Sequence, residues 1–171
     1  MELKLFEKLD DTDYLQQLYH LLELGDKEFI PPLSSRGSTT QQTLGNAHND
    51  GLGDYFNEMK QQCFVLALEG DQLAGFMSFK KDFSCDHVPP CKNLYASTSV
   101  VHPDFRGQGL MKKFYLAMIE GYPDRPIYTR TWHENIPHLR VLEKLGFTQI
   151  AMLPNHRSEG IHTVYFERKV Q

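Results

Sequence analysis

The sequence has few cysteines, one tryptophan, no excess of positive charge and no long apolar run. Its three cysteines, Cys63, Cys85 and Cys91, are an odd number, which favours a reducing, cytoplasmic setting over a disulfide framework. A net charge of −4 argues against a nucleic-acid partner. Apolar runs such as CFVLALE are far shorter than the roughly 20 residues of a membrane helix, so no membrane association is expected.

The composition supports a folded domain. At 171 residues the chain is near the usual domain size, and we expect one domain over residues 1–171. A hydrophobic content of 40% and an aromatic content of 12% are enough for a real core.

The apolar patterns predict an α/β fold in which helices pack on a mixed sheet. We expect a helix at 12–25, with Thr12 as its N-cap and Gly25 at its end. Further helices are predicted at 108–120 and 135–145, and Gly146 is a natural C-cap for the last one. Strands are predicted at 3–9, in a 63–79 hairpin that turns at Gly70-Asp71, and at 94–101, 126–132, 147–153 and 161–169. The last two strands flank a loop, PNHRSEG.

Residues 26–60 differ from the rest of the chain. The stretch PPLSSRGSTTQQTLGNAHNDGLG is rich in Pro, Ser, Thr, Gly and Asn and has no apolar period. At most short helices are expected there, one of them near 54–60. An irregular segment of this length inside a compact domain is usually functional or mobile.

The stretch VVHPDFRGQGLMKKF, residues 100–114, places Arg106, Gly107 and Gly109 between a strand and a helix. Helix starts have unpaired N–H groups and partial positive charge, and glycines let an anion approach them closely. The pattern therefore predicts a phosphate cradle, with Lys112 and Lys113 one turn further on. The alternative is a tight turn followed by surface lysines. The Gly-Lys-Ser/Thr ending of a Walker loop and the third glycine of a dinucleotide fingerprint are both absent.

Two blocks resemble the GNAT superfamily of acyl-CoA N-acetyltransferases. VVHPDFRGQGL is similar to its acyl-CoA-binding motif, Arg/Gln-x-x-Gly-x-Gly/Ala, in which Arg106 and Gly109 match and Met111 departs from the usual Gly or Ala. ENIPHLRVLEKLGF, residues 134–147, resembles the family's Asn-containing helix that ends in Leu-Gly-Phe. The expected order of elements agrees from residue 3 to residue 169.

This resemblance implies a mixed, mostly antiparallel twisted sheet flanked by helices, with the central strands 94–101 and 126–132 splayed apart. It implies acetyl-CoA as cosubstrate, with the pyrophosphate on the backbone of the glycine turn and the pantetheine arm along the edge of 95–101. The implied cofactor-binding residues are Ser99, Val100, Val101, Arg106, Gly107, Gln108, Gly109, Leu110, Met111, Asn135 and His138.

The implied activity is transfer of an acetyl group to a primary amine of a small molecule or of a peptide or protein N-terminus, by direct attack in a ternary complex. The protein would act as a monomer or a homodimer. The alternative is a sensor or scaffold module that binds acyl-CoA without turnover.

Catalytic residues are not identified by the resemblance. Leu142 stands where many relatives have a tyrosine that protonates the leaving thiolate, so catalysis without a phenol acid is expected; a thiol with a pKa of about 8.5 can leave as thiolate. Tyr95 stands where some relatives have a glutamate base. The candidates that remain are Tyr95, His138 and Glu134. Alternatively, His138 is a histidine on the helix surface and Glu134 is a loop residue without a catalytic role.

No metal is expected, because Cys85, His87 and Cys91 lack a fourth ligand with paired spacing. We expect residues 26–60 and the loop 80–93 to form the acceptor side of the cleft. The alternative is that this segment is a mobile surface loop. The charges that could orient an acceptor there are Glu28, Arg36, Asp50 and Asp54. The net acidic charge favours a cationic acceptor.

Overall fold

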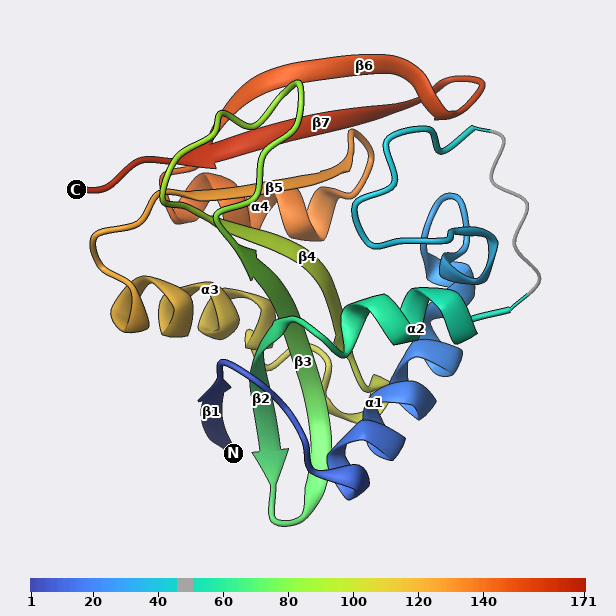
Figure 1. The fold of residues 1–171 in the computed structure, drawn as a ribbon, viewed down its shortest axis with the longest axis vertical. Coiled ribbons are helices and arrows are strands. Elements are labelled where there is room, and N and C mark those ends of the chain that lie inside the picture. The colour runs from blue at the N-terminus through green and yellow to red at the C-terminus, as the bar shows by residue number, and fades with distance from the viewer. Residues whose placement is uncertain (46–50) are drawn as a thin grey trace.

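The computed structural model describes residues 1–45 and 51–171, which form a seven-stranded sheet flanked by helices (Figure 1). The strand order is β1-β2-β3-β4-β5-β7-β6, and neighbours are antiparallel except for the parallel pair β4 and β5. The strands are β1 (Glu2–Phe6), β2 (Cys63–Glu69), β3 (Gln72–Lys81), β4 (Leu94–Val101), β5 (Ile127–Trp132), β6 (Thr148–Ser158) and β7 (Ile161–Arg168). The helices are α1 (Thr12–Gly25), α2 (Gly53–Met59), α3 (Leu110–Gly121) and α4 (Ile136–Lys144). The predicted fold class is confirmed.

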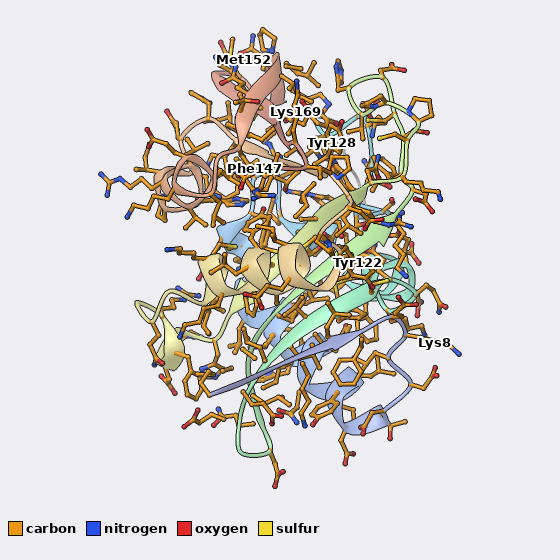
Figure 2. All side chains as sticks on the ribbon, turned by 90° about the vertical axis from the view of Figure 1, so that its left-hand side faces the viewer. Lys8, Tyr122, Tyr128, Phe147, Met152 and Lys169 are labelled. Carbon is orange, nitrogen blue, oxygen red and sulfur yellow. The ribbon has the colours of Figure 1, made fainter. Side chains whose placement is uncertain are left out.

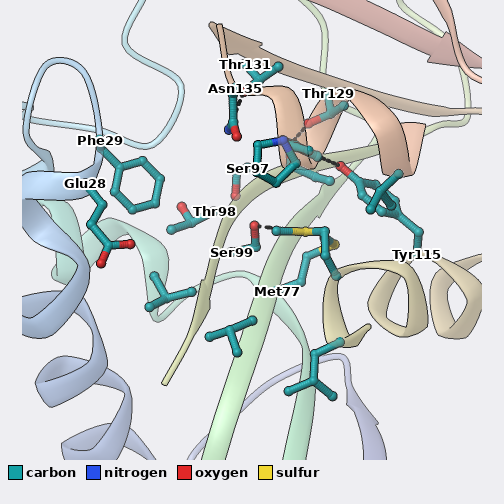
Figure 3. Close-up of a pocket in the computed structure, with 18 of the residues that line it drawn as sticks. Glu28, Phe29, Met77, Ser97, Thr98, Ser99, Tyr115, Thr129, Thr131 and Asn135 are labelled. Carbon is teal, nitrogen blue, oxygen red and sulfur yellow. Dashed lines mark hydrogen bonds between the residues drawn. The ribbon is translucent and has the colours of Figure 1, made fainter. Parts of the chain in front are cut away.

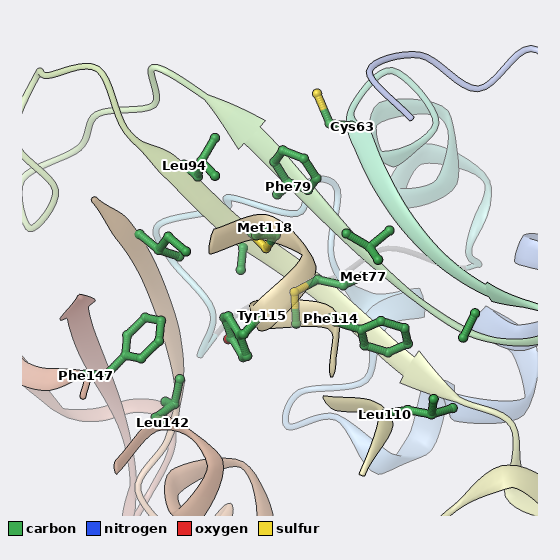
Figure 4. Close-up of a cluster of buried hydrophobic side chains, with 14 of the residues drawn as sticks. Cys63, Met77, Phe79, Leu94, Leu110, Phe114, Tyr115, Met118, Leu142 and Phe147 are labelled. Carbon is green, nitrogen blue, oxygen red and sulfur yellow. The ribbon is translucent and has the colours of Figure 1, made fainter. Parts of the chain in front are cut away.

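Each face of the sheet has its own hydrophobic core. On one face, Leu18 and Leu22 of α1 and Tyr55 of α2 pack with side chains of β2 and β3. On the other face, Phe114 and Met118 of α3 pack with β3 and β4 (Figure 4). The helices on both faces thus fix the central strands β3 and β4 from two sides.

The N-cap of helix α1 lies one residue earlier than predicted. The carboxylate of Asp11 accepts hydrogen bonds from the N–H groups of Asp13 and Tyr14, at 2.9 and 3.2 Å, so Asp11 is the N-cap and Thr12 is the first helical residue. The prediction of Thr12 was wrong because two adjacent residues were both good caps.

No helix within 1–45 or 51–171 is long and apolar enough to cross a bilayer.

Strand β6 is longer than predicted. The stretch PNHRSEG was expected to be a loop, but β6 continues to Ser158, which pairs with Ile161 of β7. The ladder is irregular between Leu153 and Ser158, where Asn155 has a positive φ of 54°. A bulge thus absorbs the turn-like residues within an edge strand, whose Met152 lies at the periphery of the molecule (Figure 2).

The central strand β4 contains a bulge and separates from β5. Ser78 pairs with Thr98 and Phe79 with Ala96, so Ser97 is an extra residue with no residue opposite it in the register, although its hydroxyl bonds to Ser78. Pairing between β4 and β5 covers only Leu94–Ala96 against Ile127–Thr129. Beyond Ala96 the two strands diverge, which confirms the predicted splaying.

The glycine at position 75 lets the sheet and α3 approach closely. A Cβ at this position would lie 2.9 Å from the carbonyl oxygen of Val100 and 3.3 Å from the ring of Phe114. We expect Gly75→Ala to lower the free energy of unfolding by about 1–3 kcal/mol, because the backbone of β4 must shift. Urea denaturation measures this change.

Gly53→Ala is the matched control, because an added Cβ at Gly53 meets nothing within 4 Å and alanine favours the helix. This variant should be as stable as the parent protein or slightly more so. Equal stability of Gly75→Ala and the parent protein would show that the close approach at β4 is not a constraint.

Candidate functional site

A cavity of about 890 Å³ lies between the diverging ends of β4 and β5 (Figure 3). Its walls include Ser97–Val101 of β4 and Thr129–Trp132 of β5. It extends from the glycine turn before α3, where Glu28 pairs with Arg106, to Phe29, Arg36 and Thr39 of the irregular segment. One continuous cavity therefore joins two regions that are far apart in the sequence.

The glycine turn presents unpaired backbone donors to this cavity. Gly107 and Gly109 have left-handed φ values of 76° and 73°, and a Cβ on either would meet nothing within 4 Å. Gly109 is also the N-cap of α3. The N–H groups of Gly107, Gln108 and Gly109 make no hydrogen bond within 1–45 and 51–171. Open space, free donors and the helix N-terminus together fit a phosphate group.

Arg106 links the turn to the irregular segment. Its Nη2 lies 2.8 Å from Oε1 of Glu28, and its Nε donates to the carbonyl oxygen of Val101 at 3.2 Å. About half of each charged side chain is exposed, so this ion pair contributes little to stability. An anion at the turn can therefore compete with Glu28 for Arg106. Arg140 and Lys144 of α4 also line the cavity, whereas Lys112 and Lys113 are not among its lining residues.

The cavity brings together all but one of the residues predicted to bind the cofactor; Gln108 is not among the lining residues. Those that line it are Ser99, Val100, Val101, Arg106, Gly107, Gly109, Leu110, Met111, Asn135 and His138. Asn135, which begins α4, is held by a hydrogen bond from its Nδ2 to Oγ1 of Thr131, at 3.0 Å (Figure 3).

Two of the predicted catalytic candidates are not among the lining residues. Tyr95 is 1% exposed and packs against Phe83 with ring centroids 4.5 Å apart; burial raises its pKa, so it is unsuited to act as a base. Glu134 is exposed and lies 3.7 Å from His133. Leu142 is fully buried in the core under α3.

His138 lies in the cavity wall in contact with a tyrosine. Its Nε2 is 2.9 Å from the hydroxyl of Tyr115, a residue of α3. Burial lowers the pKa of His138 to about 4, so the imidazole is neutral at pH 7, and burial raises the pKa of Tyr115. His138 is thus buried, which corrects the surface alternative. The sequence reasoning missed Tyr115, although it follows Met111 by four residues and so shares its helix face.

Another part of the cavity is lined by arginines and aromatic rings. Arg36 of the irregular segment, Arg130 of β5 and Arg157 of β6 line it together with Phe29 and Trp132. Residues of the loop 80–93 are not among the lining residues, and Asp50 lies outside the described residues. Sequence reasoning missed Arg157 because PNHRSEG was read as a loop.

No group of three or more His, Cys, Asp or Glu side chains suitable for a metal ion exists in the described part of the chain.

Comparisons with known proteins identify a family. Residues 28–147 match the sequence model of the Acetyltransferase (GNAT) family. No curated protein matches the chain.

Solved structures with the same fold share little sequence with this chain. An aminoglycoside 6′-N-acetyltransferase complexed with coenzyme A has a TM-score of 0.69 and 16% identity, covering 100% of this chain and 98% of that chain. A Salmonella typhimurium protein solved with its cofactor acetyl-CoA has a TM-score of 0.67 and 13% identity, covering 99% of this chain and 94% of that chain. The ribosomal-protein-S18-alanine N-acetyltransferase of Escherichia coli has a TM-score of 0.64 and 13% identity, covering 99% of this chain and 95% of that chain.

The buried, neutral His138 makes stability depend on pH. Its pKa is about 4 in the folded state against 6.5 for an ordinary histidine, so the unfolded chain binds more protons between these values. Stability must then fall as the pH falls from 6.5 towards 4. We expect urea denaturation to show a loss of about 2 kcal/mol from His138 between pH 7 and pH 5.

His138→Gln should remove this part of the pH dependence, and His20→Gln, on the exposed face of α1, should not. The interpretation fails if the parent protein and His138→Gln lose equal stability over this range.

Proposed function

This chain belongs to the GNAT family of acetyltransferases, and on that premise we propose that it transfers an acetyl group from acetyl-CoA to a primary amine of a small molecule or a peptide N-terminus. The transfer would occur by direct attack in a ternary complex. One observation carries the proposal: a single cavity joins an anion-binding turn to the unpaired edge of β4 and to an irregular segment. The setting would be the cytoplasm, which three free cysteines support.

The glycine turn and β4 would hold the cosubstrate. The N–H groups of Gly107 and Gly109 and the first turn of α3 bind the pyrophosphate, and Arg106 adds a charge-assisted contact. The backbone of 98–101, which has no strand partner on the β5 side, pairs with the pantetheine arm. Acetyl-CoA, when bound, supplies the acetyl group as a thioester.

The acceptor amine must lose a proton before or during its attack on the thioester carbon. Tyr95 and Glu134 do not line the cavity, and neutral His138, with a pKa of about 4, is too weak a base. We therefore propose that the acceptor amine loses its proton to bulk solvent or buffer before it binds, and attacks as the neutral amine. Backbone N–H groups at the free edge of β4 stabilise the negative charge that develops on the carbonyl oxygen.

Tyr115 would protonate the thiolate as the carbon–sulfur bond breaks. Its hydroxyl reaches the cavity wall from α3 and contacts Nε2 of His138. In the tautomer that carries the proton on Nε2, the neutral imidazole donates a hydrogen bond to the phenol oxygen, which orients the phenol and leaves its own proton for the thiolate. The donor lost at Leu142 is thus replaced from another helix, which revises the expectation of catalysis without a phenol acid.

The acetyltransferase proposal is tested at Gly109. Purified protein incubated with acetyl-CoA and a panel of primary amines should release free thiol. Gly109→Glu places a side chain and a like charge in the phosphate cradle, and loss of one charge-assisted contact lowers coenzyme A affinity about 10- to 100-fold. Isothermal calorimetry measures the affinity.

Gly70→Glu is the matched control, since Gly70 has a left-handed φ of 60° and open surroundings but lies in the β2–β3 turn. It should bind coenzyme A like the parent protein. Unchanged affinity in a folded Gly109→Glu variant would remove the cradle from the proposal. Coenzyme A binding without thiol release from any amine would favour the binding module.

The role of Tyr115 predicts a specific kinetic defect. Tyr115→Phe should lower kcat about 100-fold or more while leaving the KM for acetyl-CoA nearly unchanged, because general acid catalysis contributes on this scale. Tyr122→Phe, which removes a hydroxyl bonded to Glu7 after the end of α3, is the control and should retain kcat. A kcat of Tyr115→Phe equal to that of the parent would mean that the thiolate leaves unprotonated.

A further inference from the structure

Three guanidinium groups meet in the part of the cavity that Phe29 and Trp132 line. Arg36 is 5% exposed and Arg157 is 4% exposed, and Arg130 is half-buried. They come from the irregular segment, from β6 and from β5, so the fold itself brings the three positive charges together.

No carboxylate within 1–45 or 51–171 forms an ion pair with any of these arginines. Asp26 attracts Arg36 from a distance, but its own oxygens accept hydrogen bonds from the N–H and hydroxyl of Ser34, both at 2.7 Å. Burying a cation without a nearby counter-ion is costly. The positive charge of these arginines therefore has no carboxylate in direct contact among the described residues.

The bonds that these arginines do make go to neutral oxygens. Arg36 donates from Nε and Nη2 to the carbonyl of Pro31, at 3.0 and 2.6 Å. Arg157 donates from Nη1 to the carbonyl of Ile30 at 2.8 Å. Arg130 donates from Nη2 to the carbonyl of Gln41 at 2.7 Å. The carbonyl oxygens accept hydrogen bonds from some of the guanidinium N–H groups, but they do not neutralise the positive charge of the arginines.

Some donors remain available to a ligand. In the described ranges, Nη1 of Arg36 and Nη2 of Arg157 make no hydrogen bond. No fully buried side-chain nitrogen in those ranges lacks a partner, so these two atoms border accessible space. Both residues line the cavity, which is therefore the space that their free donors reach.

Aromatic rings hold two of the guanidinium groups in position. Arg36 lies over the ring of Phe29 and Arg157 over the ring of Trp132, with 5.8 and 5.7 Å to the centroids. The two rings contact each other edge to face, at 6.5 Å. This packing fixes the guanidinium planes before a ligand arrives, which lowers the entropic cost of binding.

Both buried groups remain charged at neutral pH. Burial lowers the pKa of Arg36 to about 10, and burial together with the charges of Arg36 and Arg130 lowers the pKa of Arg157 to about 9. An anion between the arginines would relieve their mutual repulsion.

We propose that the acceptor amine carries a carboxylate or an equivalent oxyanion, which binds to Arg36, Arg130 and Arg157. This rests on the proposed acetyltransferase function and narrows its substrate class to small anionic amines such as amino acids. It replaces the expectation of a cationic acceptor, which rested on net charge. Guanidinium groups match carboxylate oxygens in geometry as well as in charge.

A purely structural role is the competing explanation, because all three arginines anchor carbonyl groups of residues 30–41. The test compares aminocarboxylates and aminophosphonates with the corresponding carboxamides and uncharged amines in the thiol-release assay. We expect kcat/KM at least about 10-fold higher for the anionic acceptor of each pair. An amide lowers the amine pKa, so intrinsic reactivity opposes this result. Equal or better turnover of the amides would overturn the proposal.

Variants add a second measurement. Arg157→Gln and Arg36→Gln should raise the KM for the anionic acceptor about 10- to 100-fold and leave the KM for its amide nearly unchanged. Arg125→Gln, which removes an arginine paired with Asp82 away from the cavity, should leave the discrimination intact. An equal rise for acid and amide would assign the arginines to structure alone. If these variants do not fold, the comparison in the parent protein decides.

Failure of the proposed function is distinguishable from failure of this inference. If no amine is acetylated, calorimetry of succinate and succinamide with the coenzyme A-loaded protein still tests the arginine site. Binding of succinate alone, lost in Arg157→Gln, supports the site. Equal binding of both compounds, or of neither, overturns it.

Discussion

The loss of hydrogen bonding between β4 and β5 is the constraint on which the site depends. Three residue pairs connect these strands, and beyond Ala96 they diverge. The extra residue Ser97 reinforces this geometry: Thr98 bonds to Tyr55 on the α2 side, while Ser99 donates to the sulfur of Met111 on the α3 side. A continuous sheet would leave no cavity between the strands and no free strand edge for a ligand.

The two anion sites that we propose in the cavity differ in their donors. The turn before α3 uses backbone N–H groups, which are fixed by the positive φ values of two glycines. The arginine site proposed above consists of two buried guanidinium groups and one half-buried group, on three separate elements. A net charge of −4 gives no indication of either, because local potential depends on which charges the fold brings together rather than on their sum.

The sequence predicted the features that local patterns encode. The glycine turn and the helix after it followed from one motif, because a positive-φ turn and a helix start are local properties. The separation of the central strands was expected only from the resemblance to the family. Tyr115 and Arg157 were missed because their positions depend on how α3 packs against α4 and on a bulge that carries β6 through a turn-like stretch. Asp11 was missed because Thr12 is an equally good cap by composition. Contacts of this kind arise only once distant segments meet.

Three backbone carbonyl groups help to hold the irregular segment against the sheet. Arg36, Arg130 and Arg157 bond to the carbonyls of Pro31, Gln41 and Ile30, and every residue type offers a carbonyl. Exposed side chains between these anchors can therefore change in evolution without releasing the segment from the sheet, whereas Leu33, which is fully buried in the core, cannot. With such an arrangement, substrate preference can change in evolution while the fold remains stable. New acceptors could then be acquired by substitutions in residues 30–41 while the transfer chemistry stays intact.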